Sequence, residues 1–220
     1  MRIGFFGDSF CARADDGTYI DLLKKHYQAE VVNLGVGGSS IYDTVLLQLA
    51  PFTKSNDYPD VCVFVWSNIP RLFNRIIRDM NSASVNFSTN NSPEWNAAKQ
   101  YFKYLYDEEL EEIRYIASLK YFDELLSKIP NTTKIIHLWA FSNKSYTTGV
   151  DFHCWKSGVE IRPPLIHVST FDHQNIDAKK IDTRPNHLDG NKKNYLVFNW
   201  IKNAIDNYNV GTLNNEEITL

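Results

Sequence analysis

The sequence lacks the residue patterns that mark disulfide-rich and metal-binding proteins. Among its 220 residues only three are cysteines, Cys11, Cys62 and Cys154, and no two of them form a Cys-x-x-Cys pair. An odd number of widely spaced cysteines argues against a disulfide framework and against a zinc site. The six histidines show no His-x-His or His-Glu-x-x-His spacing, so they do not indicate a metal site either. We therefore expect a protein without a metal ion or another cofactor.

Long apolar runs and an excess of charge of one sign are also lacking. No apolar run approaches the roughly 18 residues that a membrane-spanning helix needs. Arg2 is followed at once by a strand-like segment, a start unlike a signal peptide. The 23 Lys and Arg residues and 26 Asp and Glu residues give a net charge of −3, too little to attract nucleic acid or an anionic membrane. These absences predict a cytoplasmic protein with neither partner, and they leave its oligomeric state open.

Aromatic residues, in contrast, are plentiful. The chain contains 13 Phe, 12 Tyr and 5 Trp residues, an ample supply for a buried core. With no internal repeat or linker, the length predicts a single domain over residues 1–208. Residues 209–220 are expected to form a flexible C-terminal tail.

Strand-like and helix-like patterns alternate through the first 140 residues. Apolar runs predict strands at residues 2–6, 30–34, 60–66 and 134–140. Helical spacing predicts helices between them, including one that begins at Ile41 and ends near Pro51. The alternation predicts a three-layer α/β/α sandwich with a mostly parallel sheet of about five strands, similar to flavodoxin.

The rest of the chain is less regular. Residues 81–91, rich in Asn and Ser, predict a loop insertion, and two helices are expected between Ser92 and Lys128. Residues 141–181 form a second expected insertion, in which 165–168 is the candidate fifth strand. A last helix is expected over 190–208, with Tyr195 among its inward-facing residues.

Four loops contain the residue types that acyl transfer requires: a nucleophile, a base and donors for the oxyanion. Gly7-Asp8-Ser9 follows the first strand, and a serine there can act as a nucleophile. The glycine-rich segment 33–39 follows the second strand, where glycine lets a backbone N–H approach a ligand. Asn68 follows the third strand, and His187 precedes the last helix. All four are expected at the carboxyl edge of the sheet, where open α/β sheets bind ligands.

Each of these residues also has a simpler interpretation. Ser9 alone is typical of a helix cap or a turn. Gly35–Ser40 is typical of a tight turn or of a phosphate site at a helix N-terminus. Asn68 is typical of a loop with a local hydrogen bond, and His187 of an exposed residue near a helix cap. Cys11 is a rival nucleophile but is better explained as a packed small side chain. The four loops together favour the catalytic interpretation over each simpler one.

In the order of these loops the sequence resembles the SGNH hydrolases, also called the GDSL esterase/lipase superfamily. The residues that carry the resemblance are Gly7-Asp8-Ser9, Asn33, Gly35, Gly38, Asn68 and His187. The resemblance implies a serine esterase in which Ser9 is the nucleophile and His187 the base. The backbone N–H groups of Ser9 and Gly38 and the Asn68 amide would form the oxyanion hole. The polar and aromatic mixture in residues 141–181 favours a small acyl group such as acetyl on a carbohydrate or other polar carrier.

Two of the family's blocks are altered in this chain. Trp66 and Ile69 stand in place of the glycine and aspartate of the third block, Gly-x-Asn-Asp. Arg184 stands in place of the aspartate of the fourth block, Asp-x-x-His. The nearest upstream carboxylate is Asp182, which we take as the candidate partner of His187, with a main-chain carbonyl or another aspartate as alternatives.

These departures keep two other functions open. The first is a catalytically impaired binding or structural protein that retains the fold. The second is a flavodoxin-like phosphate or nucleotide binder that uses Gly35–Ser40. It would leave His187 without a role.

Four residues are candidates for substrate contact: Trp66, Arg71, Tyr146 and Trp155. Aromatic faces suit sugar rings, although core packing explains them equally well. Arg71, Arg75 and Arg78 would share one face of a helix after Asn68. That face would be solvated or would contact an anionic substrate.

Overall fold

The computed structural model describes residues 1–67, 71–74, 78–80, 85, 88–142, 144, 149, 155–168, 187–188 and 190–214. Within these residues, six strands form one sheet in the order β2-β1-β3-β6-β7-β8, and every neighbouring pair is parallel. The strands are β1 (Arg2–Gly7), β2 (Glu30–Asn33), β3 (Val61–Trp66), β6 (Lys134–Trp139), β7 (Val159–Arg162) and β8 (Gly211–Asn214). The direction of winding changes between β1 and β3, the position at which sheets of this kind bind ligands.

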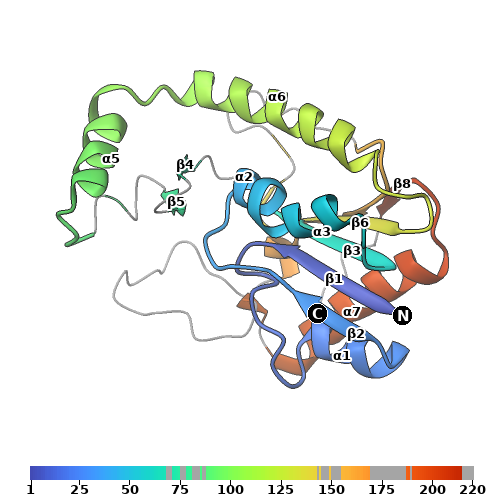
Figure 1. The fold of residues 1–220 in the computed structure, drawn as a ribbon. Helices are drawn as coiled ribbons and strands as arrows, with labels where there is room; N and C mark the ends of the chain where they lie inside the picture. Colours follow the sequence, from blue (N-terminus) through green and yellow to red (C-terminus); the bar gives the residue numbers. More distant parts are fainter. Residues whose placement is uncertain are drawn as a thin grey trace.

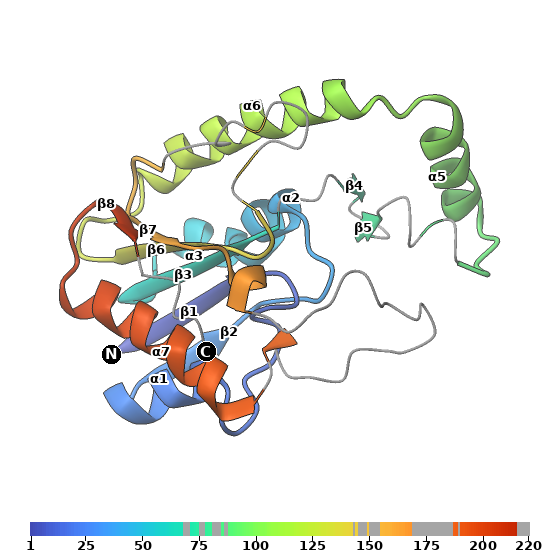
Figure 2. The same cartoon turned by 180° about the vertical axis from the view of Figure 1, so that it is seen from behind.

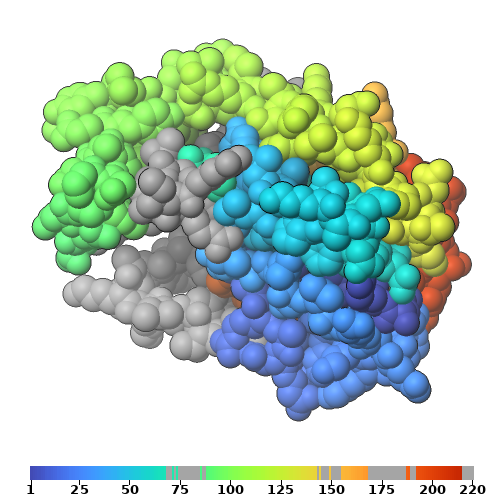
Figure 3. All heavy atoms as spheres, viewed as in Figure 1, coloured from blue at the N-terminus to red at the C-terminus, as the bar shows by residue number. Residues whose placement is uncertain are grey.

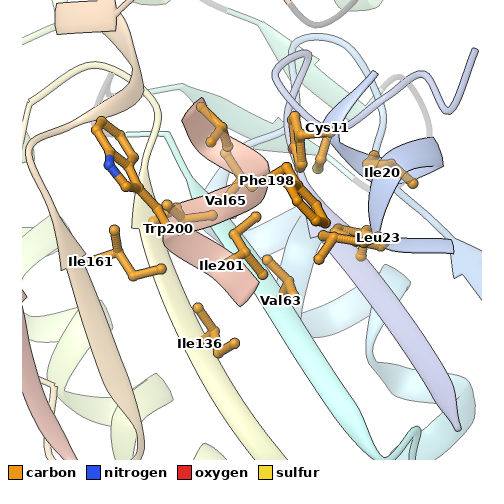
Figure 4. Close-up of a cluster of buried hydrophobic side chains, with 14 of the residues drawn as sticks. Cys11, Ile20, Leu23, Val63, Val65, Ile136, Ile161, Phe198, Trp200 and Ile201 are labelled. Carbon is orange, nitrogen blue, oxygen red and sulfur yellow. The ribbon is translucent and has the colours of Figure 1, made fainter. Parts of the chain in front are cut away.

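Helices cover both faces of this sheet (Figures 1 and 2). On one face, α1 (Tyr19–Tyr27) and α7 (Gly190–Asp206) pack on apolar side chains of β1, β3 and β6. Figure 4 shows part of this cluster, in which Phe198 and Ile201 of α7 lie over Val63. The three-layer α/β/α architecture predicted from the sequence is confirmed.

The second face is covered by α2 (Ile41–Asp43), a π-helical turn (Thr44–Gln48), α3 (Ala50–Ser55) and α6 (Glu108–Leu126). Figure 3 shows the outer surfaces of α3 and α6 side by side. Tyr42 of α2 packs edge-on against Phe122 of α6 with ring centroids 5.8 Å apart. Because both faces are covered, all six residues of β3 are buried, as its continuous apolar sequence predicts.

The strands' carboxyl ends face the side of the molecule on which α5 (Pro93–Tyr104) and the antiparallel pair β4 (Leu72–Asn74) and β5 (Arg78–Met80) lie (Figure 1). The first of the two helices expected after Ser92 is α5, and Ser92 caps it, since its hydroxyl accepts a hydrogen bond from the N–H of Trp95 at 3.5 Å. No helix of the described residues is long and apolar enough to cross a membrane.

Two helix predictions are wrong in detail. The helix that begins at Ile41 does not end near Pro51; Pro51 lies in the first turn of α3, where the N–H that proline lacks needs no partner. The segment after Asn68 is not a helix with an arginine face, because residues 72–74 and 78–80 are the paired strands β4 and β5.

The carboxyl-terminal part of the sheet also differs from the prediction. The fifth strand is Val159–Arg162, and the candidate Leu165–Val168 is a 3₁₀ helix. The expected tail is wrong for Gly211–Asn214, which pair with β7 as β8. Tyr195 is 56% exposed rather than facing inward.

Candidate active site

The chain turns sharply where β1 ends, and this turn presents Ser9. Gly7 has φ +140°, and a Cβ at this position would lie 2.1 Å from the Val65 carbonyl oxygen, so only glycine fits beside β3. After it, the N–H of Phe10 donates to Asp8 Oδ1 at 3.0 Å and the N–H of Cys11 donates to the Asp8 carbonyl at 3.0 Å. Ser9 therefore lies, half-buried, in a hydrogen-bonded turn at the carboxyl edge of the sheet.

The glycine-rich segment after β2 packs directly against this turn. The N–H of Val36 donates to the Gly7 carbonyl at 3.0 Å. A Cβ on Gly35 would lie 2.6 Å from Cys11 Sγ, so this close approach also requires glycine. A Cβ on Gly37 would lie 3.9 Å from the Ser9 Cβ. The structure thus brings together the first two loops that the sequence singled out.

His187 reaches the same place from the segment before α7. Its ring lies against Phe10, the residue after Ser9, with ring centroids 5.0 Å apart and an interplanar angle of 50°. It has φ +57°, a left-handed conformation that is uncommon outside glycine and is enriched at functional sites. The histidine predicted as the base is therefore adjacent to the turn that presents Ser9.

The Asp8 carboxyl group belongs to this turn and is fully buried. Burial raises its pKa to about 6, although the hydrogen bond from Phe10 and the positive charges of Arg71 and His187 act in the opposite direction. Its Oδ2 atom has no hydrogen-bond partner among the described residues. Asp8 is thus a buried carboxylate whose pKa the charge of His187 lowers, and the sequence analysis did not name it as a partner of His187.

Arg71 joins the loop after β3 to the glycine-rich segment. Its Nη1 atom donates a hydrogen bond to the Gly38 carbonyl, and the side chain is half-buried. Its Nε atom is buried without a partner in the part of the chain that the structure describes. The expectation of a solvated arginine is therefore wrong for Arg71, which lies inside the candidate site.

Trp66 and Trp155 belong to the core and not to a pocket wall. Their exposed fractions are 0% and 5%, and their rings stack on each other with centroids 4.7 Å apart. Trp66 Nε1 donates to His137 Nδ1 at 3.0 Å, and the His137 ring stacks on Trp155 at 4.3 Å. Because neither tryptophan offers a face to a substrate, the prediction that they contact it is wrong, and the core-packing alternative holds.

Cys11 is likewise a packed side chain. It is fully buried among the apolar residues of the α1–α7 face (Figure 4). Burial, together with the negative charge of Asp8, raises the pKa of its thiol well above its usual range. A thiol that stays protonated is a poor nucleophile, which leaves Ser9 as the nucleophile candidate in this turn.

Three of the predicted site residues, Asn68, Asp182 and Tyr146, lie outside the described residues. The residue before Asn68 is held from the second helical layer, since the Tyr115 hydroxyl of α6 donates to the Ser67 carbonyl at 2.5 Å. Among the described residues, no group of three or more His, Cys, Asp or Glu side chains is arranged to hold a metal ion.

Comparison with known proteins gives distant similarities only. No protein-family model and no curated protein sequence matches this chain. Its fold is similar to that of a gut microbial diltiazem-metabolizing enzyme, with 13% identity over 97% of this chain and 36% of that one and a TM-score of 0.40. It is similar to a lipase/acylhydrolase from Enterococcus faecalis, with 15% identity over 64% of this chain and 58% of that one and a TM-score of 0.34. It is also similar to an acetyl-xylooligosaccharide esterase from Geobacillus, with 17% identity over 67% of this chain and 63% of that one and a TM-score of 0.36.

This chain spans between about one third and less than two thirds of the length of these three proteins. Every one of these TM-scores is below 0.5, so the similarities do not show what this chain does.

Proposed function

We propose that this chain is a serine esterase of the SGNH type, with Ser9 as nucleophile and His187 as general base. The observation that carries the proposal is the meeting of three separate segments at the carboxyl edge of the sheet. Gly37 lies against Ser9, and the His187 ring lies against Phe10. The helix-cap alternative for Ser9 does not explain why the histidine segment is adjacent.

In the proposed reaction, His187 removes the proton from the Ser9 hydroxyl as its oxygen attacks the ester carbonyl carbon. The tetrahedral intermediate collapses, the C–O bond to the alcohol breaks, and His187 gives its proton to the departing alkoxide. A water molecule, deprotonated by the same histidine, then attacks the acyl-serine. The products are the carboxylic acid and the regenerated Ser9 hydroxyl.

Backbone N–H groups would stabilise the negative charge on the carbonyl oxygen in this reaction. We assign this role to the N–H groups of Ser9 and Gly38, with the Asn68 amide as third donor. The left-handed conformation of Gly38, φ +84°, and the hydrogen bond from Arg71 to the carbonyl of the following peptide unit support a fixed conformation of the loop at Gly38. Fixed donors stabilise a developing charge better than donors that must reorganise.

The positive charge that develops on His187 needs a compensating carboxylate. Asp182 keeps this role as a proposal. Asp8 is a second carboxylate that would stabilise a positive charge on His187, because its carboxyl group is buried and opposite charges on the two residues attract each other. Asp8, in the turn of Ser9, would thus partly replace the aspartate that is missing from the Asp-x-x-His block.

For the substrate, we propose a small acyl group such as acetyl on a carbohydrate or another polar carrier. With both tryptophans in the core, carrier recognition is assigned to Arg71 and Tyr146. The half-buried guanidinium of Arg71, bonded to the Gly38 carbonyl, supports this choice because a cation beside the oxyanion loop favours a polar carrier over a lipid chain.

The test is ester turnover by the purified chain with 4-nitrophenyl acetate and with an acetylated sugar. Ser9→Ala is expected to lower kcat by about 1,000-fold or more. Ser127→Ala, at an exposed serine whose hydroxyl bonds the Glu124 carbonyl at 2.8 Å, is the matched control and should leave kcat unchanged. Equal turnover in wild type and Ser9→Ala would remove Ser9 from the mechanism and favour a non-catalytic binding protein.

A further inference from the structure

The side-chain amide of Gln48 binds both backbone groups of Gly7, two residues before the proposed nucleophile. The N–H of Gly7 donates to Gln48 Oε1 at 2.7 Å, and Gln48 Nε2 lies 3.1 Å from the Gly7 carbonyl oxygen. Gln48 is only 4% exposed. A buried backbone N–H at the end of an interior strand requires a partner, and here a side chain supplies it.

The same amide also reaches the glycine-rich loop. Gln48 Nε2 lies 2.9 Å from Ser39 Oγ and 2.9 Å from Asp43 Oδ2. The Ser39 hydroxyl in turn donates to Asp43 Oδ2 at 2.8 Å, and the Asp43 side chain is fully buried. One side chain therefore connects the turn of Ser9 with the residue that follows Gly38.

The local helix geometry explains how Gln48 comes to point at Gly7. Residues 44–48 form a π-helical turn, closed by a hydrogen bond from the N–H of Leu49 to the Thr44 carbonyl at 3.0 Å. A π turn holds one more residue than an α turn and is frequent at functional sites. Gln48 lies three residues after Val45 and seven after Ile41, on the buried side of this helical segment, and its amide reaches the end of β1.

From these contacts we propose that Gln48 is a positioning residue, which fixes the Ser9 turn relative to the Gly38 loop so that their backbone N–H groups converge on one oxyanion. The proposal rests on the proposed esterase function for its catalytic meaning. The clamp itself, a hydrogen-bonded connection between the two loops, is a separate physical statement that can be tested without substrate.

The proposed role requires a carboxamide, because one end accepts the Gly7 N–H and the other has two N–H bonds shared among the Gly7 carbonyl, Ser39 Oγ and Asp43 Oδ2. Gln48→Met keeps the length of the side chain and removes every hydrogen bond. Gln48→Asn keeps the amide on a side chain that is shorter by one methylene group, so the amide no longer reaches Gly7. Either change should let the two loops move apart, and a displacement of about 1 Å at an active site can lower the rate by about 100-fold.

Asp123 provides a matched control for Gln48 at the amino ends of the strands, the side of the sheet opposite to Ser9. Asp123 of α6 is also buried and holds the segment before β7, accepting hydrogen bonds from the N–H of Lys156 at 3.1 Å and from the Ser157 hydroxyl at 2.6 Å. Asp123→Asn disturbs a buried clamp of the same kind far from Ser9. A loss of stability alone is therefore common to both variants, whereas an effect on the site is expected only for Gln48.

The experiment combines hydrogen–deuterium exchange with steady-state kinetics on wild type, Gln48→Met, Gln48→Asn and Asp123→Asn. Gln48→Met should raise amide exchange about 10-fold or more both in residues 7–12 and in residues 36–40. It should lower kcat on 4-nitrophenyl acetate by between about 10- and 100-fold, with KM within about 2-fold. Asp123→Asn should change exchange near residues 156–158 and leave kcat as in wild type. If Gln48→Met does not fold, Gln48→Asn carries the same expectations.

Exchange confined to residues 41–55, or an unchanged kcat in an active enzyme, would overturn the positioning role. If the wild type hydrolyses no ester but both loops exchange faster in Gln48→Met, the clamp stands and the esterase proposal fails. If the wild type is active and Gln48→Met matches it in both readouts, the esterase proposal stands and the clamp fails.

Discussion

Two buried aspartates at opposite edges of the sheet differ in how well their carboxylates are satisfied. Asp123, at the amino edge, accepts hydrogen bonds from Lys156 and Ser157 on both of its oxygens. Asp8, at the carboxyl edge, accepts one from Phe10, and its Oδ2 lacks a partner among the described residues. Buried polar atoms usually have a hydrogen-bond partner, so the unsatisfied Oδ2 of Asp8 supports the proposal that the functional site lies at the carboxyl edge.

The same contrast holds for two histidines. His137 is fully buried, with Nδ1 accepting from Trp66 and Nε2 bonded to the Ser157 carbonyl at 2.8 Å. His187 is half-buried beside Phe10, next to the nucleophile turn. His137 completes the aromatic core, whereas His187 lies beside the turn that contains Ser9, as its proposed role as base requires.

The histidine pair should give the largest effect. His187→Ala should lower kcat on 4-nitrophenyl acetate by about 1,000-fold while changing the free energy of unfolding by less than about 1 kcal/mol. His137→Ala should do the reverse, lowering the free energy of unfolding by about 3 kcal/mol because it leaves a cavity and an unpaired Trp66 N–H. Turnover and urea unfolding measure both. More than a tenth of the wild-type rate in His187→Ala would erase the contrast.

The aspartate pair should differ in the pH dependence of stability. Asp8 has a pKa of about 6 in the folded protein against an ordinary value of 3.8, so its protonated form favours folding and its contribution is lost as pH rises through 6. Relative to wild type, Asp8→Asn should therefore gain about 3 kcal/mol in the free energy of unfolding between pH values below 3.8 and above 6.

Asp123→Asn should lose about 2 kcal/mol at neutral pH, because three donors to the carboxylate are disturbed. Urea unfolding at several pH values measures both changes. A flat difference between Asp8→Asn and wild type across this pH range would show that the Asp8 carboxyl is solvated or paired, and the two edges would no longer differ in this respect.

A smaller effect is expected from two arginines. Arg71→Met removes the hydrogen bond to Gly38 and a positive charge near Asp8, so kcat/KM should fall by about 10-fold and the pKa of Asp8 should rise further. Arg114→Met removes an exposed ion pair with Glu111 on α6 and should change neither quantity. Equal kcat/KM in the two variants would take Arg71 out of the site.

Most of the sheet could be predicted from the sequence, because β1, β3 and β6 are buried on both faces and are therefore continuously apolar. β7 was missed because Glu160 and Arg162 interrupt its pattern. The fold accommodates Glu160 by pairing it with Arg162 at 2.8 Å and with Trp139 Nε1 at 3.2 Å, contacts that depend on tertiary structure. β8 is short and polar, and only its pairing with β7 makes it a strand.

At the site, the two glycine-containing turns could be predicted from the sequence. The structure shows why glycine is needed there, since no other side chain fits at Gly7 or Gly35. Gln48 was missed because a glutamine in an amphipathic helix is typical of the solvated face. It lies on the buried face with Ile41 and Val45, and its contacts with Gly7, Ser39 and Asp43, which depend on tertiary structure, satisfy the amide there. The tryptophans were ambiguous because aromatic residues suit a core and a sugar-binding wall equally, and which residues cover them depends on tertiary structure.

Covalent labelling with a reagent specific for activated serines tests whether Ser9 is a nucleophile activated by His187. After reaction with a fluorophosphonate, peptide mass spectrometry of the wild-type protein should find the phosphonyl group on Ser9. The label should be lost in His187→Ala and retained in Ser127→Ala. No label on Ser9 in the folded wild type, or labelling of Ser9 that is independent of His187, would contradict the account.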